Sequence, residues 1–195
     1  MKFFPTRVPR GLRVFLAATW IANFFVASTL AQASDSREAL FAKSRCPLTD
    51  MLRQVFEAPS AYQERDRYLV LSAPLIDQAY VQCMFAVNRT KLFCEASSGY
   101  YARAMDKPRR SFPSEDTKAA FRKLGFATGD DEKNYPYERD FTGTPDFGEI
   151  ATLMLLAMHD GFGARAGTRL TVQAPFAKTV QADCGSKVEV RRFVD

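Results

Sequence analysis

Histidine, tryptophan and closely spaced cysteine pairs are scarce in this sequence, which limits the chemistry that it can support. The 195 residues contain one histidine, one tryptophan, four cysteines and no CxxC motif. Metal sites are usually built from clustered Cys and His residues, and many redox sites from CxxC, so neither kind of site is expected. A Gly-rich phosphate loop is also missing. The sequence therefore predicts no metal and no cofactor.

Acidic residues are absent from the first 34 positions, where basic and apolar residues dominate. Four basic residues lie within positions 1–13, an apolar run covers 14–30, and small residues follow at Ala31 and Ala33. This pattern predicts a Sec-type signal peptide that is cleaved after Ala33 and a periplasmic or secreted product. The alternative is an uncleaved membrane anchor, because the run approaches the roughly 17-residue minimum that spans a bilayer. Asn23 interrupts the run, which favours cleavage.

Removal of residues 1–33 changes the charge of the protein. Those residues hold 4 of the 27 Lys and Arg residues and none of the 22 Asp and Glu residues, so 23 basic and 22 acidic residues remain, a net charge of +1. A nearly neutral protein gives no reason to expect nucleic acid as a partner. The segment 34–195 has a length typical of one domain.

The four cysteines, in an oxidising compartment, predict two disulfides. Two runs rich in β-branched and aromatic residues, 80–87 and 90–96, flank Asn88 and Arg89 and predict a hairpin with a tight turn. In that register Cys83 lies opposite Cys94, within reach of a disulfide. The remaining pair would join Cys46 to Cys184 and tether the C-terminal tail.

Hydrophobic spacing predicts the other elements. In chain order these are a helix over 47–57, a strand over 68–72, the hairpin, a helix over 114–124, an edge strand over 134–141, a helix from 144 to 161–163, and strands over 170–172 and 188–194. This order indicates an α+β fold, in which a three-stranded meander and further strands form an antiparallel sheet with helices on one face.

The last predicted helix is apolar on almost every side. Such a helix is buried either inside its own domain or across a dimer interface. We therefore consider a homodimer formed through this helix. Its contact residues would be Phe147, Ile150, Met154 and Met158.

Aromatic residues gather in or beside predicted loops, close to a short basic segment. Protein-interaction surfaces are enriched in aromatic residues and arginine, although aromatic residues also complete cores. The candidate interaction surface comprises Tyr100, Tyr101, Arg109, Arg110, Phe112, Tyr135 and Tyr137.

His159, the only histidine, precedes Asp160 at the end of the apolar helix. A His and Asp pair could serve a hydrolase, but no GxSxG motif or other nucleophile motif accompanies it. A protonated imidazole at a helix C-terminus also has a structural role, because it meets the negative end of the helix dipole. We therefore predict no catalytic residue.

Several short strings resemble bacterial TY-Chap and YbjN-like domains, which are similar in fold to type III secretion chaperones. The strings are Tyr80 to Cys83, Cys94 to Ala96, Leu124 to Phe126, Asn134 with Tyr135, and Pro145 to Phe147 continuing to Gly163. The resemblance implies a helix, a three-stranded meander, a second helix, further strands and a long final helix. It also implies a non-enzymatic, chaperone-like domain that binds a protein partner or dimerises.

The sequence leaves three functions open. The first is an exported, non-catalytic protein-interaction domain of the bacterial cell envelope with an unknown protein partner. The second is a small envelope hydrolase that uses His159 and Asp160. The third is a ligand-binding periplasmic protein that uses the aromatic loops. Contact with a membrane is expected only if the signal is retained.

Overall fold

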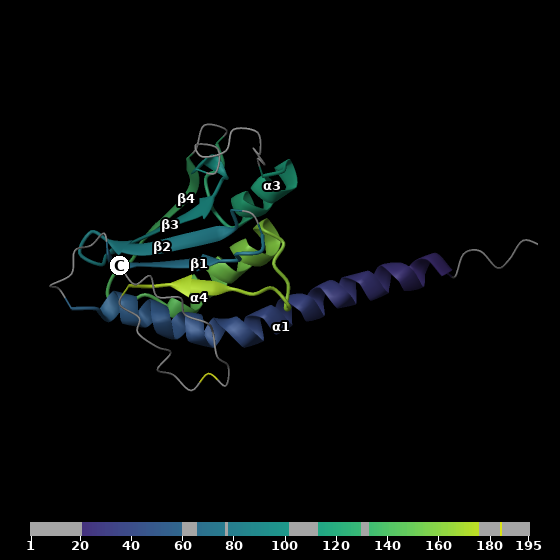
Figure 1. Ribbon diagram of the computed structural model, residues 1–195, viewed down its shortest axis with the longest axis horizontal. Helices are drawn as coiled ribbons and strands as arrows, with labels where there is room; N and C mark the ends of the chain where they lie inside the picture. The colour runs from purple at the N-terminus through teal and green to yellow at the C-terminus, as the bar shows by residue number, and fades with distance from the viewer. Residues whose placement is uncertain are drawn as a thin grey trace, which may run out of the picture. The chain divides into compact units, whose positions relative to one another are not determined.

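The computed structural model describes residues 21–59, 66–76, 78–101, 113–129, 133–175 and 184, with side chains from residue 37 onward (Figure 1). The chain divides into two compact units, Met1–Asp35 and Ser36–Asp195. Every strand among the described residues belongs to the second unit. Most of the predicted signal peptide and the predicted strand over 188–194 lie outside the described residues.

Helix α1 extends over Ile21–Glu57 and contains Pro47. The prediction that Pro47 begins the helix is wrong, because residues with high helix propensity, among them Glu38, Ala39 and Leu40, precede it and continue the helix through it. The predicted apolar face is confirmed. Its buried members are Leu48, Met51, Leu52 and Val55.

Arginine side chains complete the C-terminal end of α1. The last carbonyls of a helix lack donors within the helix, and a buried one needs a partner. The guanidinium of buried Arg67 donates a hydrogen bond to the carbonyl of Phe56 in the last turn at 3.4 Å. It also donates to the two carbonyls that directly follow the helix, those of Ala58 at 2.6 Å and Pro59 at 2.8 Å. Arg89 donates to the same Ala58 carbonyl at 3.3 Å. The end of α1 is thereby fixed to the start of β1 and to the hairpin loop.

Five antiparallel strands form one sheet in the order β4-β3-β2-β1-β5 (Figure 1). The predicted meander is confirmed as β1 (Tyr68–Ser72), β2 (Tyr80–Ala86) and β3 (Lys91–Ser97). β4 (Asn134–Asp140) is the predicted edge strand, and β5 (Thr171–Gln173) pairs with β1. The fold is therefore α+β with an open antiparallel sheet.

The loop between β2 and β3 differs from the prediction. The last paired residues are Ala86 and Lys91, so the loop has four residues where a two-residue turn was expected. Val87, Asn88 and Arg89 all have positive φ, at 51°, 55° and 65°. The left-handed region is unusual for a β-branched residue such as Val87. A hydrogen bond of 2.7 Å from Thr90 Oγ1 to the Val87 carbonyl supports this loop.

Helices α1, α3 and α4 pack on one face of the sheet. Inward-facing Phe85 of β2 contacts Phe56 of α1 at 5.1 Å and Phe147 of α4 at 6.1 Å between ring centroids. Inward-facing Tyr135 of β4 contacts Phe121 of α3 at 5.6 Å. Alternate residues of β1, β2 and β3 are buried against these helices, as expected for a sheet covered on one side.

The two later helices begin close to their predicted starts at 114 and 144, one and three residues further along the chain. The Ser114 hydroxyl accepts from the Thr117 amide at the start of α3 (Glu115–Lys123). The Asp146 carboxylate accepts from the amides of Gly148 and Glu149 at the start of α4 (Phe147–Leu156). The last turn of this helix is a π-helix, η2 (Ala157–Gly161), which the sequence did not predict.

Candidate functional site

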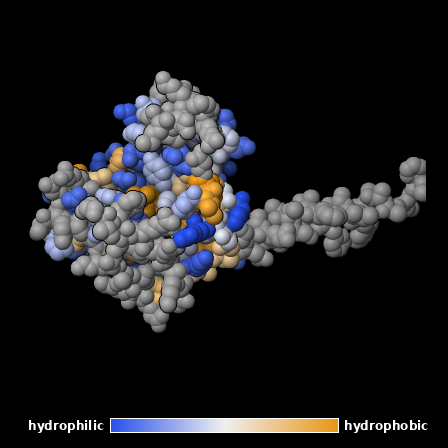
Figure 2. Space-filling view, in the orientation of Figure 1, coloured by the Kyte–Doolittle hydropathy of each residue, from blue (hydrophilic) through white to orange (hydrophobic). Residues whose placement is uncertain are grey.

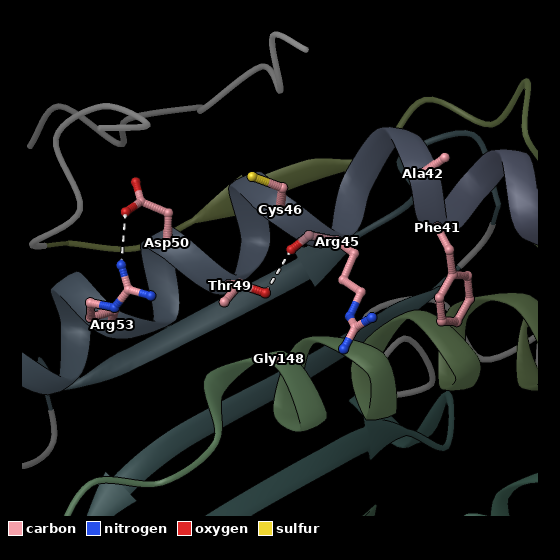
Figure 3. Close-up of a pocket in the computed structure, with 8 residues that line it drawn as sticks. All are labelled: Phe41, Ala42, Arg45, Cys46, Thr49, Asp50, Arg53 and Gly148. Atoms are coloured by element: carbon pink, nitrogen blue, oxygen red, sulfur yellow. Dashed lines mark hydrogen bonds and ion pairs between the residues drawn. The ribbon is translucent and has the colours of Figure 1, made fainter. Parts of the chain in front are cut away.

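A surface groove lies along α1 beside the N-terminus of α4 (Figure 3). Its volume is about 540 Å³. The described residues that line it are Phe41, Ala42, Arg45, Cys46, Thr49, Asp50, Arg53 and Gly148. Seven of these eight residues come from α1 and one from α4, so the groove depends on how these two helices pack.

Phe41 and Arg45 are one helical turn apart on α1, and both side chains point toward α4 (Figure 3). The glycine at position 148 leaves room for the Arg45 guanidinium. A Cβ atom there would lie 3.3 Å from Arg45 Nη2 and 3.1 Å from Asp146 Oδ1. The groove therefore presents a half-buried aromatic ring beside an exposed cation.

The second arginine of the groove is held by a buried carboxylate and an aromatic ring. Arg53 Nη1 lies 3.8 Å from Asp50 Oδ1, and Gln54 donates to the other Asp50 oxygen at 3.0 Å. The Arg53 guanidinium also lies 5.9 Å from the centroid of the Phe147 ring. Asp50 is buried whereas Arg45 and Arg53 are exposed, so a molecule in the groove meets mainly positive charge.

Both predicted disulfides are present, and one of them borders the groove. Cys46 and Cys184 are joined with a Cα–Cα distance of 5.5 Å, and Cys46 is exposed. Cys83 and Cys94 are joined at a Cα–Cα distance of 4.0 Å in the predicted cross-strand register. Disulfides persist in oxidising compartments, so the pairing supports an exported protein.

His159 and Asp160 form a close pair within the π-helical turn. His159 Nδ1 lies 2.6 Å from Asp160 Oδ1, and Arg37 donates to Asp160 Oδ2 at 3.2 Å. His159 Nε2 is buried and has no hydrogen-bond partner among the described residues. A general base must reach the proton that it removes. His159 therefore has one nitrogen beside a carboxylate, as a general base does, but its other nitrogen is buried.

The structure separates the residues of the predicted interaction surface. Tyr100 and Tyr101 are exposed and contact each other, with ring centroids 5.4 Å apart. Tyr135 does not belong to that surface, because the register of β4 turns it into the core, where it is 2% exposed. Tyr137 lies on the same face of β4, partly buried against Phe126. The remaining predicted members lie outside the described residues. These are Arg109, Arg110 and Phe112.

The four residues predicted to form a dimer contact lie instead in the core of a single chain. Each of the four residues is buried inside the domain against the sheet and the other helices, and Met154 and Met158 have 0% exposure. Their apolar surface is therefore already covered within one chain. The four residues are Phe147, Ile150, Met154 and Met158.

The exposed surface of the second unit mixes hydrophilic and hydrophobic side chains, as Figure 2 shows for one face. The large hydrophobic residues that are exposed among those described are Leu75, Val87, Tyr100 and Tyr101. In the described part of the chain, no helix combines the length and the hydrophobicity that crossing a bilayer requires.

The groove was not predicted from the sequence, although one signal was available. Phe41, Arg45 and Thr49 recur every four residues, which is the spacing of one helix face. Phe41 and Arg45 precede the predicted helix start at Pro47, and Thr49 is a polar residue outside the predicted apolar face. Gly148 had no sequence signal, because only the packing of α1 on α4 requires a small residue there.

Comparison with known proteins identifies no relative. No protein-family model, no curated protein and no solved structure matches the chain.

Proposed function

We propose that this chain is exported and that its mature segment, 34–195, is a non-catalytic, chaperone-like domain that binds a protein partner in the cell envelope. The disulfides support an oxidising compartment. The basic and apolar residues of 1–30 support a signal peptide. The resemblance to TY-Chap and YbjN-like domains supports protein binding. N-terminal sequencing of the exported protein is expected to start at Ser34.

The groove on α1 is the observation that carries this proposal. It brings the aromatic ring of Phe41 and the exposed guanidinium groups of Arg45 and Arg53 to one surface. Arginine and aromatic residues are enriched at protein interfaces, where they contribute large contact area and charged hydrogen bonds. We infer that the partner contributes acidic and apolar groups to this groove.

The hydrolase is the weaker alternative because of the position of the imidazole. His159 Nε2 is buried, so a substrate could reach it only after a rearrangement of η2. The hydrogen bond to Asp160 and the ion pair between Asp160 and Arg37 instead connect η2 to α1. We propose a structural role for His159.

Crosslinked pull-down from the intact envelope tests the binding proposal. An Arg45→Glu variant reverses one charge of the groove and is expected to lose most of the partner that the unchanged protein captures. Lys123→Glu is the matched control, because it reverses an exposed charge on α3, outside the groove. Equal capture by both variants would exclude the groove as the docking site, provided that circular dichroism shows both to be folded.

A further inference from the structure

The two disulfides of this domain differ in how accessible they are. Cys83 and Cys94 are 1% and 0% exposed and lie in the core, on the sheet face that the helices cover. Cys46 is exposed on α1, where it lines the groove, and Cys184 is partly buried. Figure 3 shows that the Cys46 side chain points away from α4. The residues of the Cys46–Cys184 bond are therefore more open to a dissolved molecule than those of the Cys83–Cys94 bond.

Thiol–disulfide exchange requires access to the bond, because an attacking thiolate must reach one of the two sulfur atoms. Reduction of a buried bond therefore waits for the core to open, whereas reduction of an exposed bond does not. We propose that Cys46–Cys184 is a thiol–disulfide exchange site, which a dithiol reductant opens while Cys83–Cys94 remains intact.

The exchange proceeds in two steps. A thiolate of the dithiol attacks Cys46 Sγ, the bond between the two protein sulfurs breaks, and Cys184 leaves as a thiolate that takes up a proton. The second thiol of the reagent then attacks the mixed disulfide and releases Cys46 as a thiolate, which is also protonated. Two electrons pass from the dithiol to the protein, and the reagent ends as a disulfide.

Reduction at this site alters the proposed docking groove. Cys46 is one of the groove-lining residues, and its bond holds Cys184, which follows β5 in the chain, against α1. Opening the bond gives a groove-lining residue, Cys46, a free thiol and releases Cys184 from α1. The redox state of this one bond thus determines whether Cys184 is held at the groove-lining helix α1.

Timed reduction of the full mature protein with dithiothreitol tests the site. Thiols that appear are blocked with N-ethylmaleimide and located by peptide mapping. Labels on Cys46 and Cys184 are expected to appear at least about tenfold faster than labels on Cys83 and Cys94. Equal rates, or earlier labelling of Cys83 and Cys94, would overturn the proposal.

Two double variants keep the test valid if loss of the first bond unfolds the domain. Cys83→Ala with Cys94→Ala retains only the exposed bond, and Cys46→Ala with Cys184→Ala retains only the buried one. Each variant is first checked for folding by circular dichroism. Among folded variants, the one with the exposed bond is expected to be reduced faster, and the opposite order would contradict the proposal.

Discussion

The bonds Cys83–Cys94 and Cys46–Cys184 differ in sequence separation as well as in burial. The buried bond joins residues 11 positions apart, whereas the exposed bond joins residues 138 positions apart. On the chain-entropy model these separations correspond to about 3 and about 5 kcal/mol of stabilisation. The exposed bond, Cys46–Cys184, is therefore also the one that restricts the unfolded chain more. Burial controls reactivity, while sequence separation controls the entropic effect.

Deleting each bond separately gives the largest expected effect. Cys46→Ala with Cys184→Ala is expected to lower the free energy of unfolding by up to about 5 kcal/mol, against about 3 kcal/mol for Cys83→Ala with Cys94→Ala. Urea unfolding, followed by circular dichroism, measures both values. A larger loss for the hairpin pair would show that packing of the buried sulfurs outweighs chain entropy, and would reverse the comparison.

A smaller effect is expected from adding one atom to the interior. A Cβ atom at Gly161 would lie 2.5 Å from Phe121 Cζ, and Phe121 is fully buried. Gly161→Ala is therefore expected to destabilise the domain by about 1–3 kcal/mol, the usual cost of overpacking. The measurement is again urea unfolding.

Gly167→Ala is the matched control for that variant. No atom lies within 4 Å of a Cβ atom at this position, so a change of less than about 0.5 kcal/mol is expected. An equal loss of stability in both variants would show that Gly161 is not packed tightly against Phe121.

The smallest expected effect concerns an ion pair at the surface. Lys91 Nζ lies 3.0 Å from Glu138 and 3.9 Å from Asp140 across the β3–β4 ladder. The hydrogen bond to Glu138, and then the charges of Glu138 and Asp140, raise the pKa of Lys91 above its ordinary value of 10.5. The ammonium is thus favoured in the folded state, so its contribution to stability is full below pH 10.5 and is lost as pH rises through the raised pKa.

Comparison of the unchanged protein with Lys91→Met tests this pH dependence. The difference in their unfolding free energies is expected to be small, constant between about pH 8 and about pH 10, and to vanish at higher pH. A difference that grew with pH in the alkaline range would contradict the sign of the shift.

Local sequence signals predicted most of the fold. The helix start predicted at 114 was confirmed to within one residue, and the residues on either side of Asn88 placed Cys83 opposite Cys94. These predictions succeeded because caps, alternation and hairpin register depend on neighbouring residues. The helix start predicted at Pro47 was wrong, because residues with high helix propensity precede this proline and α1 continues through it.

The candidate site was less predictable than the fold. The groove forms only when α1 and α4 pack together, because that packing brings Gly148 beside Phe41 and Arg45. Similarly, the apolar character of the last helix predicted that Phe147 and Met154 are buried. It did not show whether they are buried by a second chain or by the sheet of the same chain.

The sequence by itself determined the α+β order of elements and the pairing of the cysteines. Local patterns gave the elements and the register that pairs Cys83 with Cys94, which left Cys46 to pair with Cys184. Tertiary structure alone decided which disulfide is buried and which has a residue lining the groove, and it buried His159 Nε2. Burial depends on contacts between residues far apart in the chain, such as Phe85 with Phe147, and these contacts cannot be predicted from the local sequence.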